Sequence, residues 1–418
     1  MKNVAYLFIC LLIVLSSCSK SSPGSGISVT WNDTLVAYAP VPITKSFSKR
    51  VFAHILPWFE TNLTNNYNGG NAWGVHWTGG TNSNNQQPYF DAPSQIASHY
   101  YPMIGPYASG DTNVIDYQLL LMKLSGIDGV FIDWPGLQNY SDFSMNVQNS
   151  NAIISRLARV GLKYAIVYED QDLRYTNSPI TQAQKDMSYI QANYFLDPNY
   201  EKIGTVPILL DFGPQPPLTV APDWTQVFSV FTTPVDFFTL EFNSDAGGNA
   251  SGQFAWVDST NITNLNDFYA SNPGIKISAA YPGFESIYAE EPPTTPPSPT
   301  WIIPPAISTF NETLALALAQ TNNNYIQLVT WNDYGEGTMI EPTTQFQYGF
   351  LTDLQQQLGV QSSLGLSDLQ AVNSLYEARY SNTYTNYNPA NLAELQQIYY
   401  DIVALKMDTA KALLQGNF

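Results

Sequence analysis

The feature that most constrains the fold is a regular alternation of short apolar runs with amphipathic segments. The runs are rich in β-branched and aromatic residues, and most are followed by a helical pattern. Near-continuous apolar strands that alternate with helices are typical of a parallel sheet covered on both faces. The eight candidate strands are Val51–Trp58, Gly129–Trp134, Tyr164–Glu169, Val206–Phe212, Asp236–Phe242, Phe254–Val257, Ile275–Tyr281 and Tyr325–Trp331. Eight such strands predict an α/β fold, the closed (β/α)8 TIM barrel.

The segments between the candidate strands predict helices and long loops. Asn151–Val160 carries aliphatic residues at helical spacing. Thr309 and Glu312 match a capping box before the apolar run that follows them. Two long connections, Glu60–Thr112 and Glu291–Pro305, are expected to be loops on the active face of the barrel.

The N-terminal residues predict export. A Lys is followed by an apolar run and then by Leu15-Ser16-Ser17-Cys18, which resembles a bacterial lipobox. A membrane-spanning anchor is the alternative, but a span needs about 20 apolar residues and this run is shorter. We therefore expect a signal peptide at 1–17, a lipid on Cys18, and a lipoprotein at the outer membrane, the cell surface or the periplasmic face.

The remainder of the chain divides into three parts by composition and pattern. Residues 18–48 begin rich in Ser, Pro and Gly and are expected to be a linker. Residues 49–360 hold the eight candidate strands and are expected to form the catalytic barrel. Residues 361–418 contain two helical patterns, Leu369–Arg379 and Ala393–Leu414, which we expect to pack on the barrel. A distinct helical domain is the alternative for this last part.

The composition narrows the class of ligand. The formal net charge is −18, and such a surface repels nucleic acid, whose affinity for proteins comes mostly from Lys and Arg on phosphates. Aromatic residues make up 14% of the chain and charged residues only 12%. Rings with polar tips suit uncharged polar ligands such as sugars. We expect a monomer with a polysaccharide or oligosaccharide substrate and no cofactor.

Acidic and aromatic residues recur where the candidate strands end. Catalytic groups of this fold come from the carboxyl ends of its strands, so these residues are expected to line one rim. The expected substrate contacts are His54, Trp58, Asp133, Trp134, Glu169, Glu241, Trp256, Tyr281, Trp331, Asn332 and Tyr334, with His76 and Trp77 from a glycine-rich loop. The three His residues are too scattered for a metal site, so no metal is expected.

Asp333 and Glu336 are the expected catalytic pair. Glycosidic cleavage needs one carboxylic acid and a second carboxylate, and three residues of extended chain reach about 10 Å, which allows either standard separation. Gly335 and Gly337 let this segment turn sharply. Alternatives are an Asx-turn at Asp333 and a cap or an ion pair at Glu336.

Motifs around this pair resemble two families of glycoside hydrolase. Thr330-Trp331-Asn332-Asp333-Tyr334-Gly335-Glu336 resembles the end of strand eight in family 71, the fungal-type α-1,3-glucanases. The run from Asn332 to Glu341 is similar to an Asn-Glu-Trp-His-Glu-Gly-Thr-Gln-Ile-Glu run of family 99, the endo-α-mannosidases. Ala53-His54-Ile55-Leu56-Pro57-Trp58 is similar to the opening strand of both families.

The resemblance implies roles for the pair. Glu336 occupies the general acid/base position and Asp333 that of the second carboxylate. Asp, Tyr and Gly stand where family 99 has Glu, Trp and His, which favours an endo-acting α-1,3-glucanase; Gly337 departs from the Ser usual in family 71. An endo-α-mannosidase is the alternative activity. A non-catalytic, lipid-anchored glycan-binding protein is the alternative of another class.

Overall fold

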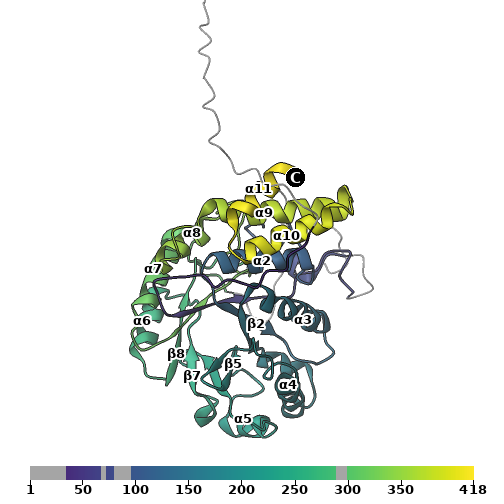
Figure 1. Ribbon diagram of the computed structural model, residues 1–418. Helices are drawn as coiled ribbons and strands as arrows, with labels where there is room; N and C mark the ends of the chain where they lie inside the picture. The colour runs from purple at the N-terminus through teal and green to yellow at the C-terminus, as the bar shows by residue number, and fades with distance from the viewer. Residues whose placement is uncertain (1–33, 67–71, 80–95, 289–298) are drawn as a thin grey trace, which may run out of the picture.

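The computed structural model describes residues 34–66, 72–79, 96–288 and 299–418 (Figure 1). Cys18, the expected signal peptide, the first part of the expected linker and parts of both long loops lie outside these residues. Within the described ranges no helix combines the length and apolar character needed to cross a bilayer.

Eight parallel strands close into a barrel, which confirms the expected fold. β1 pairs with β2 on one side and with β9 on the other, and β3 pairs directly with β5. A short strand, β4 (Lys202–Ile203), pairs antiparallel with the first two residues of β5. The barrel strands are β1 (Arg50–Ile55), β2 (Gly129–Trp134), β3 (Lys163–Tyr168), β5 (Val206–Asp211), β6 (Asp236–Leu240), β7 (Gly252–Phe254), β8 (Ile275–Ala280) and β9 (Tyr325–Leu328).

The sixth barrel strand, β7, begins two residues before its expected start at Phe254. Gly252 looks like a loop residue in the sequence but belongs to the strand. A Cβ at Gly252 would lie 2.0 Å from the carbonyl oxygen of Ile275 on β8. Glycine is therefore required here by the close approach of two strands.

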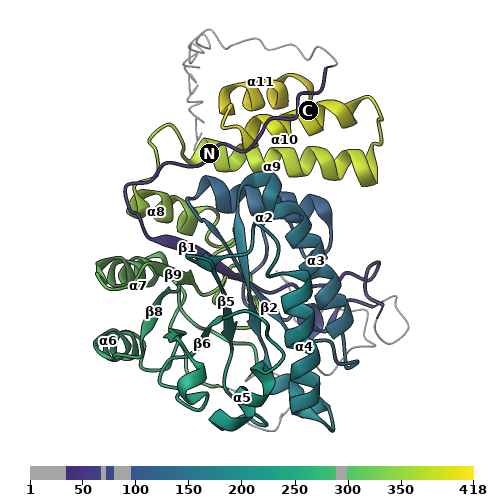
Figure 2. The ribbon, with the colours of Figure 1, turned by 60° about the horizontal axis from the view of Figure 1, so that its bottom comes forward.

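Helices cover the outside of the barrel, as Figure 2 shows. They are α2 (Thr112–Leu124), α3 (Phe143–Val160), α4 (Pro179–Asn193), α5 (Ala221–Phe228), α6 (Ile262–Ala270), α7 (Ile307–Ala319) and α8 (Gly349–Leu358). A short helix, α1 (Val75–Thr78), lies in the loop between β1 and α2. The expected capping box is wrong. Helix α7 starts at Ile307 after Ala306, which makes no side-chain cap, so Thr309 already lies in the first turn.

Three further helices lie together along one side of the barrel (Figures 1 and 2). They are α9 (Leu366–Tyr380), α10 (Asn391–Val403) and α11 (Met407–Asn417). Helix α9 packs on α2. The pattern expected as one helix over 393–414 is two, because the chain turns at Leu405, whose φ is +58°.

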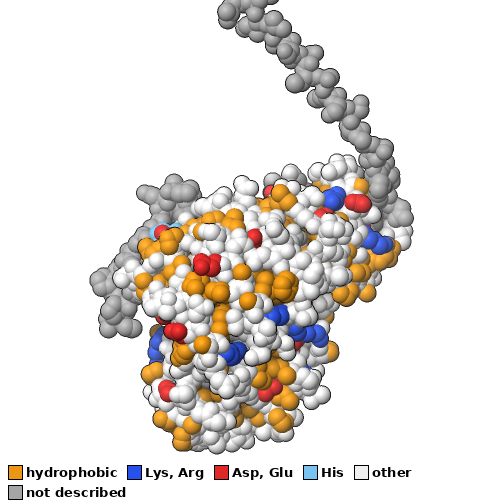
Figure 3. Space-filling model, turned by 90° about the vertical axis from the view of Figure 1, so that its left-hand side faces the viewer, with side chains coloured by type: hydrophobic (Ala, Val, Ile, Leu, Met, Phe, Trp, Pro, Cys, Tyr) orange, Lys and Arg blue, Asp and Glu red, His pale blue; other side chains and the backbone are white. Residues whose placement is uncertain are grey.

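The described part of the expected linker, residues 34–48, is not free of the fold. It runs in extended conformation beside the C-terminal helices (Figure 2). The N–H of Val36 donates to Oε1 of Gln397 at 2.6 Å, and the N–H of Val41 donates to the carbonyl of Val403 at 3.2 Å. On the face drawn in Figure 3, Lys, Arg, Asp and Glu are few and are scattered among uncharged side chains.

The packing of the C-terminal helices generates a stability prediction. Ile398 of α10 is fully buried in the same core cluster as the barrel strands. Ile398→Ala should therefore destabilise the whole chain by about 2–5 kcal/mol, because it removes buried methylenes and leaves a cavity. Eight of the nine Trp lie within residues 49–360 and the ninth, Trp31, precedes them, so Trp fluorescence mainly reports the barrel while far-UV circular dichroism reports both parts.

In urea unfolding of this variant, the two signals should shift together. Leu392→Ala, at a side chain 50% exposed on the same helix, should change little. A loss of helical signal that leaves the Trp transition in place would instead show a separate C-terminal domain.

Candidate active site

A cavity of about 480 Å³ opens at the carboxyl ends of the barrel strands. Its wall is formed by strand ends and by the loops that follow them. Of the residues expected to form the site, it brings together His54, Trp58, His76, Asp133, Glu169, Trp256, Asp333 and Glu336. Both members of the expected catalytic pair therefore face one space.

The loop after β9 holds this pair in a defined turn. The backbone N–H of Asp333 donates to Oγ1 of Thr330 at 2.7 Å, and Oδ1 of Asp333 accepts the N–H of Glu336 at 3.0 Å. The side chain of Asp333 therefore bonds within the turn, to the N–H three residues on, and Asp333 also lines the cavity. Gly337 has a φ of +69°, and a Cβ there would lie 2.8 Å from the carbonyl oxygen of Glu285.

A buried carboxylate anchors the loop from behind. Glu341 is 1% exposed and accepts hydrogen bonds from the hydroxyls of Tyr107 and Tyr334 at 2.8 and 2.9 Å and from Nε2 of Gln118 at 2.8 Å. Nδ2 of Asn332 donates to the Tyr107 hydroxyl at 3.1 Å. Asn332 and Tyr334, expected as substrate contacts, therefore position the loop. Sequence reasoning assigned Glu341 no role of its own.

Six carboxyl groups line the cavity, and the pKa of all but Asp142 is raised, with burial as the largest cause. Burial and then the neighbouring Asp333 and Glu169 hold the pKa of Glu336 well above its usual range. Burial raises the pKa of Asp333 to about 6 and that of Asp133 to about 7. The pKa of Glu169 is raised well above its usual range by burial and by Asp133. Asp333 is therefore mostly ionised at neutral pH, and the raised pKa of Glu336 favours its protonated form.

A neutral histidine forms part of the cavity floor. Burial lowers the pKa of His54 to about 4, so the ring carries no charge at neutral pH. Its Nε2 lies 3.8 Å from Oδ1 of Asp133, and its ring meets the Trp256 ring edge-on at 4.8 Å. This arrangement offers a neutral imidazole and an aromatic surface to a ligand.

Aromatic rings form one flank of the cavity. His76 stacks flat on Trp58 with ring centroids 4.1 Å apart, and its Nε2 lies 3.3 Å from Oδ2 of Asp142. Tyr140 and Tyr175, from the loops after β2 and β3, stack at 3.7 Å and are 44% and 39% exposed. Tyr140, Asp142 and Tyr175 were absent from the expected site, since irregular loops give no periodic pattern to follow.

Several expected contacts lie outside the cavity lining because their side chains point into the packing around it. Trp77 and Trp331 are fully buried, and Nε1 of Trp77 donates to the carbonyl of Tyr107 at 2.8 Å. Trp134 packs against Tyr189 of α4 at 6.0 Å, on the opposite side of β2 from Asp133.

Two more of the expected substrate contacts, Tyr281 and Glu241, also bond to residues of the protein and do not line the cavity. The hydroxyl of Tyr281 donates to Oδ1 of Asn261 at 2.9 Å. Glu241 accepts a hydrogen bond from Nδ2 of Asn264 at 3.1 Å and does not line the cavity. Both residues therefore hold loops around the barrel end.

A second acidic pair lies behind the cavity, where β3 and β5 end. Both carboxylate oxygens of Asp211 are buried without a hydrogen-bond partner, and Oδ1 of Asp170 is in the same state. A Cβ at Gly213 would lie 2.4 Å from Oδ1 of Asp170 and 2.8 Å from Oδ2 of Asp211, so glycine makes room for the pair. Within the described ranges no group of three or more His, Cys, Asp or Glu is arranged to hold a metal ion.

Comparison with solved structures finds a similar fold in proteins described as glycoside hydrolases. The glycoside hydrolase family 99 endo-α-mannosidase from Bacteroides thetaiotaomicron aligns with a TM-score of 0.56 at 14% identity, over 79% of this chain and 100% of that chain. Its complex with bis-tris-propane aligns with a TM-score of 0.57 at 14% identity, over 79% and 99% of the two chains.

A structure described as a glycoside hydrolase-like protein aligns over the same shares, 79% and 99%, with a TM-score of 0.53 at 14% identity. No family model and no curated protein sequence matches the chain. The comparison therefore establishes the class of fold, a (β/α)8 barrel of the design seen in these structures.

The unpaired Asp211 generates a prediction about pH and stability. Burial, followed by the nearby Asp170 and Glu169, holds its pKa well above the usual range, so the native state retains a proton that the unfolded chain releases near pH 4. The destabilisation of the folded state by Asp211 is therefore absent at low pH and grows as the pH rises toward the pKa of Asp211 in the folded protein.

Asp211→Asn should thus stabilise the protein more at pH 8 than at pH 5. The difference should be about 1.4 kcal/mol for each pH unit of this interval that lies below the pKa of Asp211 in the folded protein. Urea unfolding at both pH values measures this. Asp245→Asn, at an exposed site, should show no such dependence. An equal effect of Asp211→Asn at both pH values would contradict the raised pKa.

Proposed function

We propose that this chain is an endo-acting glycoside hydrolase of α-linked polysaccharide. The observation that carries the proposal is the pair Asp333 and Glu336, which face one cavity with pKa values separated in the sense that acid/base catalysis needs. A protein that only bound glycan would have no need of a buried proton donor beside a carboxylate.

The geometry supports different roles for the two carboxyl groups, with Glu336 as the general acid and Asp333 as the general base. Glu336, whose raised pKa favours the protonated form, donates its proton to the glycosidic oxygen as the bond from that oxygen to C1 breaks. Asp333, ionised above about pH 6, accepts the proton of the attacking oxygen. That oxygen belongs to water in a glucanase-like route and to the sugar 2-hydroxyl in a mannosidase-like route. Asp133, Glu169 and neutral His54 line the same cavity and would hydrogen-bond sugar hydroxyls.

Two polymers are the candidate substrates. The solved structures of similar fold include endo-α-mannosidases, which supports α-mannan. The Asp333-Tyr334-Gly335 segment resembles the α-1,3-glucanase motif, which supports α-1,3-glucan. Digestion of both polymers with sizing of the products distinguishes them, and binding without cleavage of either would indicate the non-catalytic alternative.

The catalytic pair can be tested by isosteric substitution. Glu336→Gln should lower the rate on natural polymer by roughly 10²–10⁴-fold but retain activity on dinitrophenyl glycosides, whose leaving group needs no proton. Asp333→Asn should be inactive on both kinds of substrate, because the attacking step fails. Glu241→Gln makes the same change at a strand end outside the cavity and should keep near wild-type rates.

The wild-type rate should follow a bell in pH. It should rise through about pH 6 as Asp333 ionises and fall at higher pH as Glu336 loses its proton. Near wild-type turnover of polymer by both Glu336→Gln and Asp333→Asn would make the pair structural.

The Tyr140–Tyr175 stack should contribute to substrate binding. Tyr175→Ala removes one exposed ring and the support of the other, so KM should rise roughly three- to tenfold with little change in kcat. Tyr175→Phe keeps the stack and should stay near wild type. An unchanged KM in Tyr175→Ala would exclude this flank from substrate binding.

We further propose that Cys18 carries lipid and anchors the enzyme to the membrane, as its lipobox-like context suggests. Cys18→Ala should move the protein from the membrane to the soluble fraction, and mass spectrometry should find the lipid only on wild type. Equal partitioning of both forms, with no lipid on wild type, would refute the anchor.

A further inference from the structure

A second cavity, of about 250 Å³, lies where the barrel meets the C-terminal helices. Its wall comes from α2, α3, α9, α10 and the turn 381–385 between the last two. It shares no lining residue with the cavity that holds Asp333 and Glu336. Nothing in the proposed glycosidase activity requires it.

The wall of this second cavity concentrates positive charge. The chain has five Arg against a net charge of −18, and three of the five, Arg156, Arg159 and Arg379, line this one cavity. The single acidic residue in the wall is Asp116. The wall of the second cavity therefore carries an excess of two positive charges, although the protein as a whole is acidic.

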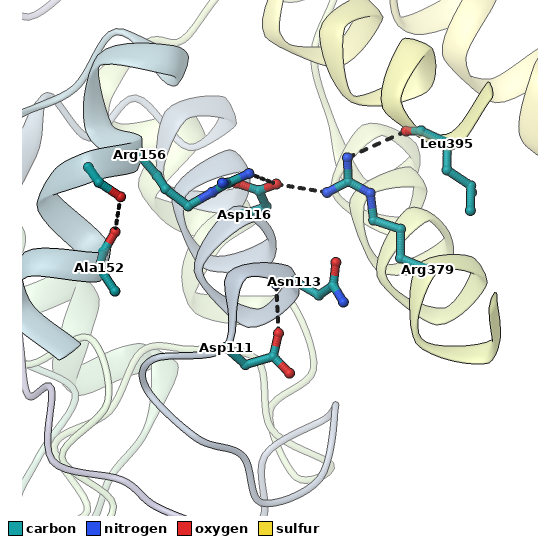
Figure 4. Close-up of polar contacts among 8 residues, drawn as sticks. Asp111, Asn113, Asp116, Ala152, Arg156, Arg379 and Leu395 are labelled. Atoms are coloured by element: carbon teal, nitrogen blue, oxygen red, sulfur yellow. Dashed lines mark hydrogen bonds and ion pairs between the residues drawn. The ribbon is translucent and has the colours of Figure 1, made fainter. Parts of the chain in front are cut away.

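Asp116 is already fully engaged by two of the guanidinium groups. Figure 4 shows Arg156 and Arg379 reaching it from opposite sides. Nε and Nη2 of Arg156 donate to its two oxygens, each at 2.5 Å, and Nη1 of Arg379 donates to Oδ2 at 2.8 Å. Among the described residues Arg159, one turn further along α3 and exposed, has no acidic partner.

Two neutral donors in the wall also lack acceptors. Asn382 is 3% exposed, and its Oδ1 accepts the N–H of Asn388 at 3.0 Å, which fixes the orientation of the amide. Its Nδ2 and the Nε2 of Gln396 are buried without a hydrogen-bond partner. Buried donors are normally satisfied, so the wall is short of acceptor atoms.

We propose that this second cavity binds a tetrahedral oxyanion, a phosphate or sulfate group, either free or carried on a sugar. Such a group has only acceptor oxygens and negative charge, which match an excess of guanidinium and amide donors. A cation would be repelled, and a neutral sugar would leave the excess charge uncompensated. The bound anion would join α3 of the barrel to α9 and α10.

Binding to the full-length protein tests the proposal. Inorganic phosphate and sulfate are titrated by calorimetry and by thermal unfolding, with sodium chloride adjusted to hold the ionic strength constant. A saturable heat of binding and a saturable rise in Tm are expected, because the anion binds only the folded state. A response no greater than that to chloride would overturn the proposal.

Arg159→Gln keeps both ion pairs to Asp116 and should weaken phosphate binding roughly tenfold. Arg174 lines the first cavity, so Arg174→Gln removes the same charge away from the second cavity and should leave phosphate binding unchanged. Equal affinity of wild type and Arg159→Gln would overturn the assignment of the site. Glucose 6-phosphate distinguishes the source: tighter binding than inorganic phosphate indicates a phosphorylated sugar, and weaker binding indicates a free anion.

Discussion

Closure of the parallel sheet is the constraint on which the rest of this molecule depends. β1 is paired on both edges, with Phe52 opposite Gly129 of β2 and Arg50 opposite Tyr325 of β9. Because all barrel strands run the same way, their carboxyl ends meet at one rim. Acidic residues that are far apart in the chain are thereby brought into a single partly dehydrated space. The crowding of carboxyl groups follows from the topology.

That crowding separates the protonation states of chemically similar groups. When a carboxyl group is buried among other carboxyl groups, its protonated form is favoured, because burial and the neighbouring negative charges both disfavour ionisation. Asp333 escapes part of this effect because its Oδ1 accepts the N–H of Glu336, while Glu336 receives no comparable stabilisation of its charge. The turn that fixes the position of the pair therefore also helps to assign acid and base.

The sequence predicted the barrel well because parallel strands are buried on both faces and leave near-continuous apolar runs. It predicted four of the carboxyl groups that line the cavity, because polar residues at the ends of such runs are conspicuous, but it also indicated Glu241, which does not line the cavity. It could not tell which neighbour faces inward: Asp133 lines the cavity, whereas Trp134 packs outward against α4. Side-chain direction alternates along a strand, so an error of one residue exchanges a ligand contact for a core residue. The loop residues Tyr140 and Tyr175 had no such pattern.

The extended segment 34–48 has a mechanical consequence. It is fixed at several points along its length, by Val36 and Val41 against α10 and by Ser46 against the end of α8. A pulling force applied at residue 34 would therefore load these hydrogen bonds in turn before it reached β1. The barrel strand that carries His54 is shielded from tension by a sequence of weaker attachments, which can detach and re-form without opening the sheet.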